Sequence, residues 1–249
     1  MRQGWDPRSL FILALVFFVL PSLLRGGVSR PSNEVIVASL LSAVIAVSVH
    51  EFMHAWSAYL LGDDTAYRMN RVTLNPISHF DPLGAIGFIL IALGYNSVAW
   101  GKPVPVNFNR LRGDFRQRKL ASLIVAGCAP LSNVVMAVIT AGIYGLLLRG
   151  DRDLGFTGTF LERFIVLNMV LAAFNLIPLP PLDGYRILTG LLPSFWFPTM
   201  ARLEQFGLFL PLLLIWVDGR LKLGIYAELV GPGLDLITRL VNYVFRLAL

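Results

Sequence analysis

The chain has 249 residues, of which 56% are hydrophobic and 14% charged. A soluble domain carries about a quarter charged residues, so this composition excludes an ordinary soluble enzyme and indicates several membrane segments. The net charge of +6 does not indicate nucleic-acid binding, because the basic residues lie between apolar segments, where membrane proteins place them.

The apolar segments predict an all-α polytopic membrane protein. Residues 10–24 are expected to form a short retained membrane helix, with a signal peptide as the alternative. Residues 35–61, 120–148 and 160–177 are each long enough for a spanning helix. Shorter apolar runs follow at 206–217 and 225–249. We expect about six transmembrane segments in all, forming one membrane-embedded domain over residues 1–249 with its core at 35–190.

Two short strands are predicted between the first two core helices. Residues 67–75 alternate in part and stop at Asn75-Pro76, and residues 102–106 contain two prolines, which suits an edge strand. The glycine-rich segment 83–100 between them is interpreted as a re-entrant hairpin, with a short spanning helix as the alternative. It must pack against protein, because irregular backbone is not tolerated in lipid.

The charge pattern predicts an orientation. The segment 102–119 holds Lys102, Arg110, Arg112, Arg116, Arg118 and Lys119 against a single acid, Asp114. Such a basic segment is expected on the cytoplasmic side. With a re-entrant hairpin before it, the helix 35–61 ends in the cytoplasm, the helix 120–148 leaves and the helix 160–177 returns. The ends of the first and third core helices therefore share the cytoplasmic face.

Residues 50–54 read His-Glu-Phe-Met-His inside the apolar helix 35–61. Histidines four residues apart project from one face of a helix and can share a metal ion. Zinc suits two histidines and a carboxylate, and Glu51 is placed to act as general base on the attacking water. Such polar residues in an apolar span are costly unless they have partners, which disfavours a chance match.

A third ligand is needed, and His79, Asp81 and Asp183 are the candidates. Asp183 follows the proline-rich end of the returning helix, on the face that His54 approaches, so we prefer it. The alternative is that Asp183-Gly184 is an ordinary turn.

The sequence resembles the site-2 proteases, the intramembrane zinc proteases of peptidase family M50. The matching motifs are His50-Glu51-x-x-His54, the run from Asn175 through Pro178 and Pro181 to Asp183-Gly184, the stretch 75–84, and Gly101-Lys-Pro-Val-Pro-Val-Asn107. The last two point to the compact subgroup without a PDZ domain.

The resemblance implies that His50, His54 and Asp183 bind zinc, the only cofactor expected, and that Glu51 is the catalytic base. It implies that Asn133 and Asn175 hold the substrate backbone or the oxyanion; hydrogen bonding between helices is the alternative. The expected substrates are transmembrane proteins or peptides in the lipid bilayer, cut near its cytoplasmic face. A membrane metal-binding or transport protein and a non-catalytic scaffold are the alternative functions.

Overall fold

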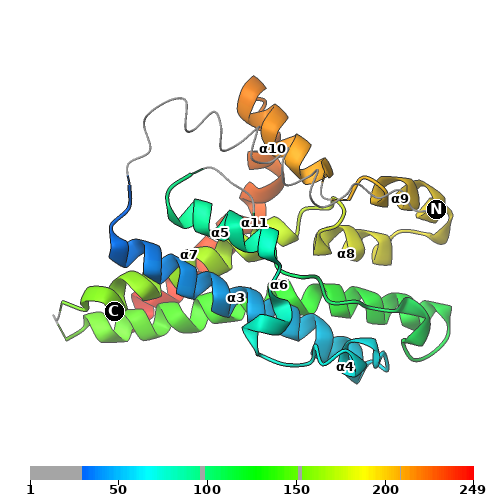
Figure 1. The fold of residues 1–249 in the computed structure, drawn as a ribbon, viewed down its shortest axis with the longest axis horizontal. Coiled ribbons are helices and arrows are strands. Elements are labelled where there is room, and N and C mark those ends of the chain that lie inside the picture. The colour runs from blue at the N-terminus through cyan, green and yellow to red at the C-terminus, as the bar shows by residue number, and fades with distance from the viewer. Residues whose placement is uncertain (1–29, 96–98, 151–152, 208) are drawn as a thin grey trace.

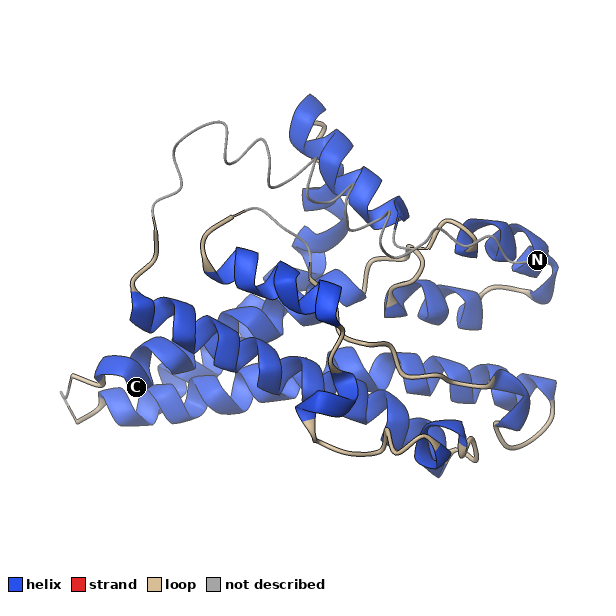
Figure 2. Cartoon of the chain, viewed as in Figure 1, coloured by secondary structure: helices blue, strands red, loops and turns tan. Residues whose placement is uncertain are grey.

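A computed structural model of the chain describes residues 30–95, 99–150, 153–207 and 209–249, and this part is built from helices and loops (Figures 1 and 2). The helices are α3 (Asn33–Leu60), α4 (Thr65–Arg68), η2 (Pro76–His79), α5 (Pro82–Ala92), η3 (Phe108–Arg110), α6 (Phe115–Leu148), α7 (Gly155–Asn175), α8 (Asp183–Leu191), η4 (Ser194–Trp196), α9 (Phe197–Glu204), α10 (Phe209–Leu221) and α11 (Ile225–Ala248).

Helices α3, α6 and α7 pack side by side and form the core that the sequence predicts (Figure 1). The amide of Arg112, just before α6, donates to the carbonyl of Leu61 at the end of α3 (2.9 Å). At the other end, Thr159 of α7 donates to Glu34 at the start of α3 (2.6 Å). The helices α3 and α7 therefore run in the same direction and α6 runs against them.

Small residues carry the packing of this core, while large apolar residues face outward. Ala38, Ala46, Ala129 and Ala137 are fully buried, whereas Ile139 is 57% exposed. Small side chains let membrane helices approach closely, and outward-facing apolar side chains suit contact with lipid. The helix surface thus has the pattern of a multi-pass membrane protein.

By length and composition, three described helices can cross a membrane: α3, α6 and α7. A fourth span is reached only if Ser194–Glu204 and Phe209–Asp218, bent by 74°, are counted as one. The prediction of about six segments is therefore too high for the described residues. Helix α5 is apolar but only 11 residues long, and α11 is interrupted by charged residues such as Asp235 and Arg239. The predicted helix at residues 10–24 lies outside the described residues.

The hairpin predicted at residues 83–100 begins and ends at the same place. The amide of Lys102 donates to the carbonyl of His79 (2.9 Å). A side chain at Gly84 would lie 1.9 Å from the carbonyl oxygen of Trp100, so the start of α5 and the returning chain touch backbone to backbone. A segment whose ends meet does not cross to the opposite side, which supports the re-entrant interpretation over the short spanning helix.

The two predicted strands are wrong: the described residues contain helices and loops but no strand. Residues Thr65–Arg68 form α4, and the left-handed Asn70 then turns the chain (φ 53°). Residues 102–106 form a loop, in which Pro103 and Pro105 have no N–H to give to a sheet. The amides of Lys102 and Val104 donate to the carbonyl of His79 and the carboxylate of Glu51, so neither of them is available to a ladder.

Candidate metal centre

Helix α3 places His50 and His54 one turn apart on its buried face. Their ring centroids are 4.9 Å apart and the rings stand nearly perpendicular, at 87°. The two residues are only 5% and 6% exposed. Because they lie four residues apart in a helix that is otherwise apolar, both imidazoles point toward α6 and α8 instead of toward the surface.

Asp183, the first residue of α8, completes the cluster. One carboxylate oxygen (Oδ1) lies 3.1 Å from His54 Nε2, and the other (Oδ2) lies 3.3 Å from His50 Nε2.

Gly184 allows this placement by its lack of a side chain. A Cβ there would lie 2.1 Å from the carbonyl oxygen of Leu176 and 2.6 Å from that of Ile177. The backbone of α8 therefore lies directly against the turn that ends α7. The glycine is needed for this close approach, which brings Asp183 within reach of α3.

The other nitrogen of each histidine is held by a carbonyl oxygen. His50 Nδ1 lies 2.7 Å from Asn133 Oδ1, and His54 Nδ1 lies 3.0 Å from the backbone oxygen of Val125. Both acceptors require a proton on Nδ1, so in each neutral imidazole Nε2 keeps the lone pair that a metal ion would bind. This is the tautomer and orientation that metal-binding histidines use.

The donor atoms of His50, His54 and Asp183 fit a zinc ion. One ligand atom from each residue lies within 4.8 Å of the others, and all three residues are buried. Two imidazole nitrogens and a carboxylate match a catalytic zinc site, which keeps a further position open. Among the described residues this is the one group of such side chains close enough together to hold a metal ion.

Glu51 borders the same centre but is not part of the ligand group. Its Oε2 accepts a hydrogen bond from the amide of Val104 (3.0 Å). A cavity of about 150 Å³ adjoins the centre and is lined by His50, Glu51, His54 and Asp183. The carboxylate of Glu51 thus lies at a small cavity between α3, α8 and the loop at 101–104.

The structure separates the other candidates for the third ligand from this centre. His79 is buried elsewhere, with its Nε2 2.8 Å from the carbonyl oxygen of Thr73. Asp81 caps α5 by accepting from the amides of Leu83 (3.0 Å) and Gly84 (2.9 Å).

The two asparagines singled out from the sequence have different surroundings. Asn133 is fully buried; its Oδ1 faces His50 and its Nδ2 donates to Asn168 Oδ1 (2.8 Å). Asn175 lines the cavity and donates through Nδ2 to its own helix, at the carbonyl of Leu171 (2.9 Å). Asn133 thus contacts a histidine, while Asn175 faces the space beside the centre.

Two residues near the centre were missed by the sequence interpretation. Asn168 is fully buried on α7 and links Asn133 to the carbonyl of Phe164 (2.8 Å). A lone amide in an apolar span was the available signal. Arg71 is 5% exposed and donates through Nη2 to the carbonyl of Lys102 (2.6 Å). Burial lowers the pKa of Arg71, and the negative charge of Glu51 opposes that effect.

Comparison with known proteins agrees with this geometry. Residues 152–217 match the model of peptidase family M50. The chain is 37% identical over 216 residues to "Putative zinc metalloprotease YwhC" of Bacillus subtilis, covering 83% of this chain and 92% of that protein. It is 25% identical over 221 residues to "Putative zinc metalloprotease Rip2" of Mycolicibacterium smegmatis, covering 86% and 82%. No solved structure matches the chain at a significant level.

The similarity to YwhC spans nearly the whole of both proteins, and the family match covers Asp183 and the helix that leads to it. The chain therefore belongs to peptidase family M50.

Proposed function

We propose that the chain is an intramembrane zinc metalloprotease that hydrolyses peptide bonds of transmembrane proteins, with zinc held by His50, His54 and Asp183. The observation that carries the proposal is the place of this buried cluster: His50 and His54 lie inside a 28-residue apolar helix that is long enough to span a membrane. A water-dependent reaction at such a depth calls for a substrate that is itself in the membrane.

The depth of the centre follows from the helix. His50 is about 26 Å along α3 from Asn33, and only about 9 Å of helix follow His54. The same end of the core is joined to the basic segment 102–119. Under the positive-inside rule, the centre lies within the bilayer, nearer the cytoplasmic face.

The residues divide the chemistry between them. When bound, zinc polarises the scissile carbonyl and lowers the pKa of a water molecule toward neutrality. The carboxylate of Glu51 takes the proton from the attacking water and passes it to the nitrogen of the leaving amine. The Val104 amide holds Glu51 Oε2, so Oε1 is the oxygen available to the water.

Asn175 is the better placed of the two asparagines to hold the substrate. It lines the cavity, and with Nδ2 bound to Leu171, its Oδ1 is available to accept from a substrate amide. A transmembrane helix must unwind before its amides can be reached, so such an acceptor helps to keep the cut segment extended. To Asn133 we assign the role of orienting the His50 ring, in keeping with its contacts.

Glu51→Gln tests the function. The variant should keep its zinc and lose cleavage of a model transmembrane substrate in liposomes by about a hundredfold to ten-thousandfold, since the ligands remain and the base is gone. His54→Ala should lose both zinc and cleavage. The matched control is Glu34→Gln on the same helix, whose carboxylate contacts Thr159 far from the centre.

Equal cleavage by wild type and Glu51→Gln would contradict the proposed protease activity. Zinc-dependent movement of metal across liposomes without cleavage would favour a transport protein. Binding of the substrate without either activity would favour a scaffold.

A further inference from the structure

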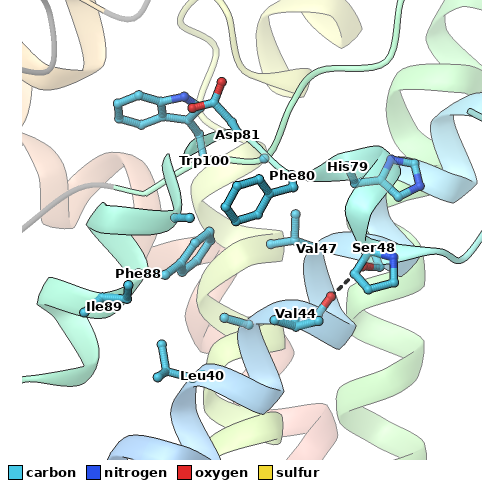
Figure 3. A pocket seen from close by; sticks show the side chains of 14 residues that line it. Leu40, Val44, Val47, Ser48, His79, Phe80, Asp81, Phe88, Ile89 and Trp100 are labelled. Atoms are coloured by element: carbon cyan, nitrogen blue, oxygen red, sulfur yellow. Dashed lines mark hydrogen bonds between the residues drawn. The ribbon is translucent and has the colours of Figure 1, made fainter. Parts of the chain in front are cut away.

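A second cavity lies beside the metal centre, between α3 and the hairpin that contains α5. Its volume is about 300 Å³. Figure 3 shows Val44 and Val47 of α3 facing Phe80, Phe88, Ile89 and Trp100 across it. The lining is therefore largely apolar, and the cavity is large enough for a bulky side chain.

The polar residues at the edge of this cavity already have hydrogen-bond partners. Ser48 donates to the carbonyl of Val44 (2.6 Å), the dashed line in Figure 3. Asp81 accepts from two amides at the start of α5. His79 is bonded through Nε2 to the carbonyl of Thr73, and only its buried Nδ1 has no hydrogen-bond partner. A polar ligand would find few free partners here, whereas an apolar group would gain from leaving water.

The apolar cavity adjoins the cavity at the metal centre, because the two share lining residues. Val47, Phe88, Trp100 and Gly101 line both. Gly101 marks the junction: a Cβ there would lie 2.6 Å from Val47 Cγ1 and 3.5 Å from Glu51 Oε1. Gly101 and Val47 are therefore in close contact, and they form part of the wall that the two cavities share.

The distance between Glu51 and the apolar cavity suits two neighbouring residues of one bound peptide. Val47 precedes Glu51 by four residues, which is about 6 Å along the helix. In an extended peptide, residues rise by about 3.3 Å and their side chains alternate in direction. A peptide whose carbonyl lies beside Glu51 can therefore place the side chain of an adjacent residue into the apolar cavity.

We propose that this cavity is a specificity site that receives one large apolar side chain of the substrate, such as leucine or phenylalanine, next to the bond that is cut. The proposal rests on the proposed proteolysis and adds to it a substrate class. The occupant is a substrate side chain because the cavity shares part of its wall with the cavity that Glu51 lines.

The test uses two substitutions on α5 and a matched control. Ala85→Leu reduces the cavity and Ile89→Ala enlarges it, since both residues line it. Ile86→Ala is the control: Ile86 is on the same helix and 41% exposed, close to the 46% of Ile89, but it does not line the cavity. The cut bond of a model transmembrane substrate is first located by mass spectrometry. Alanine, leucine and phenylalanine are then compared at each residue next to it.

Wild type should prefer leucine or phenylalanine over alanine at one of these positions by about tenfold to a hundredfold in kcat/KM. Ala85→Leu should abolish the preference for the phenylalanine substrate. Ile89→Ala should increase kcat/KM for the phenylalanine substrate relative to the leucine substrate. Ile86→Ala should keep the ratios of wild type. Zinc content, measured on each variant, should be unchanged.

Two results would overturn the specificity site while leaving the protease intact. One is that Ala85→Leu and Ile89→Ala keep the ratios of wild type. The other is that they slow all substrates alike, as expected for a cavity filled by lipid. If zinc-loaded wild type cuts none of the substrates, the proposed proteolysis itself fails, and the specificity site falls with it.

Discussion

His50 and Asn133 are joined across two core helices, with 2.7 Å between the histidine Nδ1 and the amide Oδ1. The amide nitrogen of Asn133 continues the contact to Asn168 on α7 (2.8 Å). A single line of polar groups thus connects α3, α6 and α7 at the level of the metal centre.

Replacing Asn133 by leucine should weaken zinc binding. The substitution removes the acceptor that fixes the tautomer and ring orientation of His50, and loss of such a partner typically costs ten- to a hundredfold in metal affinity. Competition with a chromophoric chelator measures the effect. Asn133→Asp keeps an oxygen for His50 and should retain most of the affinity.

The same pair of variants separates the two interpretations of Asn133. If it holds the oxyanion or the substrate instead, Asn133→Leu will bind zinc as tightly as wild type and lose only kcat. Thr140→Val serves as control, because Thr140 is buried on the same helix but is not part of the centre.

Asn168→Leu should lower stability by about 1 kcal/mol, the scale of hydrogen bonds between membrane helices. It leaves the Asn133 amide inside the core with only the more distant carbonyl oxygen of Ala46 as acceptor (3.5 Å). Thermal unfolding in detergent is the measurement. Asn175→Leu is the comparison, because that side chain bonds to its own helix; its stability should change less. Equal losses of stability in the two variants would argue against a special role for the link between Asn133 and Asn168.

The core helices and the motif at residues 50–54 were predictable because each signal is local. Length and apolar composition define α3, α6 and α7, and spacing by four places His50 and His54 on one face. The hairpin was likewise inferred from a glycine-rich apolar segment of marginal length for a spanning helix. Its closure at Gly84 and Trp100 supports that interpretation.

The strands could not be judged from pattern alone. The prolines at 103 and 105 favour an extended backbone in residues 102–106, but a strand also needs a partner, and partners depend on tertiary contacts. Here Glu51, Arg71 and His79 take the hydrogen bonds that a second strand would have taken. The same reason hid Arg71: nothing in its neighbours along the chain shows that it is buried near Glu51.

Arg71→Met should lower kcat roughly tenfold or more with zinc content unchanged, since a hydrogen bond from a charged donor contributes about 1.5–3 kcal/mol. The guanidinium holds the carbonyl of Lys102, two residues before the Val104 amide that binds Glu51. Its loss releases the loop that positions the base. Steady-state kinetics and metal analysis together give the readout.

Arg68→Met is the matched control, because Arg68 is exposed and pairs with Asp64 at the surface (2.6 Å). Exposed ion pairs contribute at most about 1 kcal/mol, so this variant should behave as wild type. An Arg71→Met enzyme with normal kcat would show that the loop is held without the guanidinium.

Gly184→Ala should weaken zinc binding and cleavage together, although it adds only one methyl group. The new Cβ would meet the carbonyl oxygen of Leu176 at 2.1 Å and that of Ile177 at 2.6 Å, and neither can rotate away because both belong to the backbone. Helix α8 must then shift, and Asp183 is its first residue. Displacing a ligand in this way should cost about tenfold or more in zinc affinity.

Gly231→Ala in α11 is the control, since a Cβ there meets nothing within 4 Å. It should keep wild-type affinity and, as alanine favours helix over glycine by about 1 kcal/mol, keep or raise the unfolding temperature. Zinc affinity equal to wild type in Gly184→Ala would mean that Asp183 does not depend on this close backbone contact.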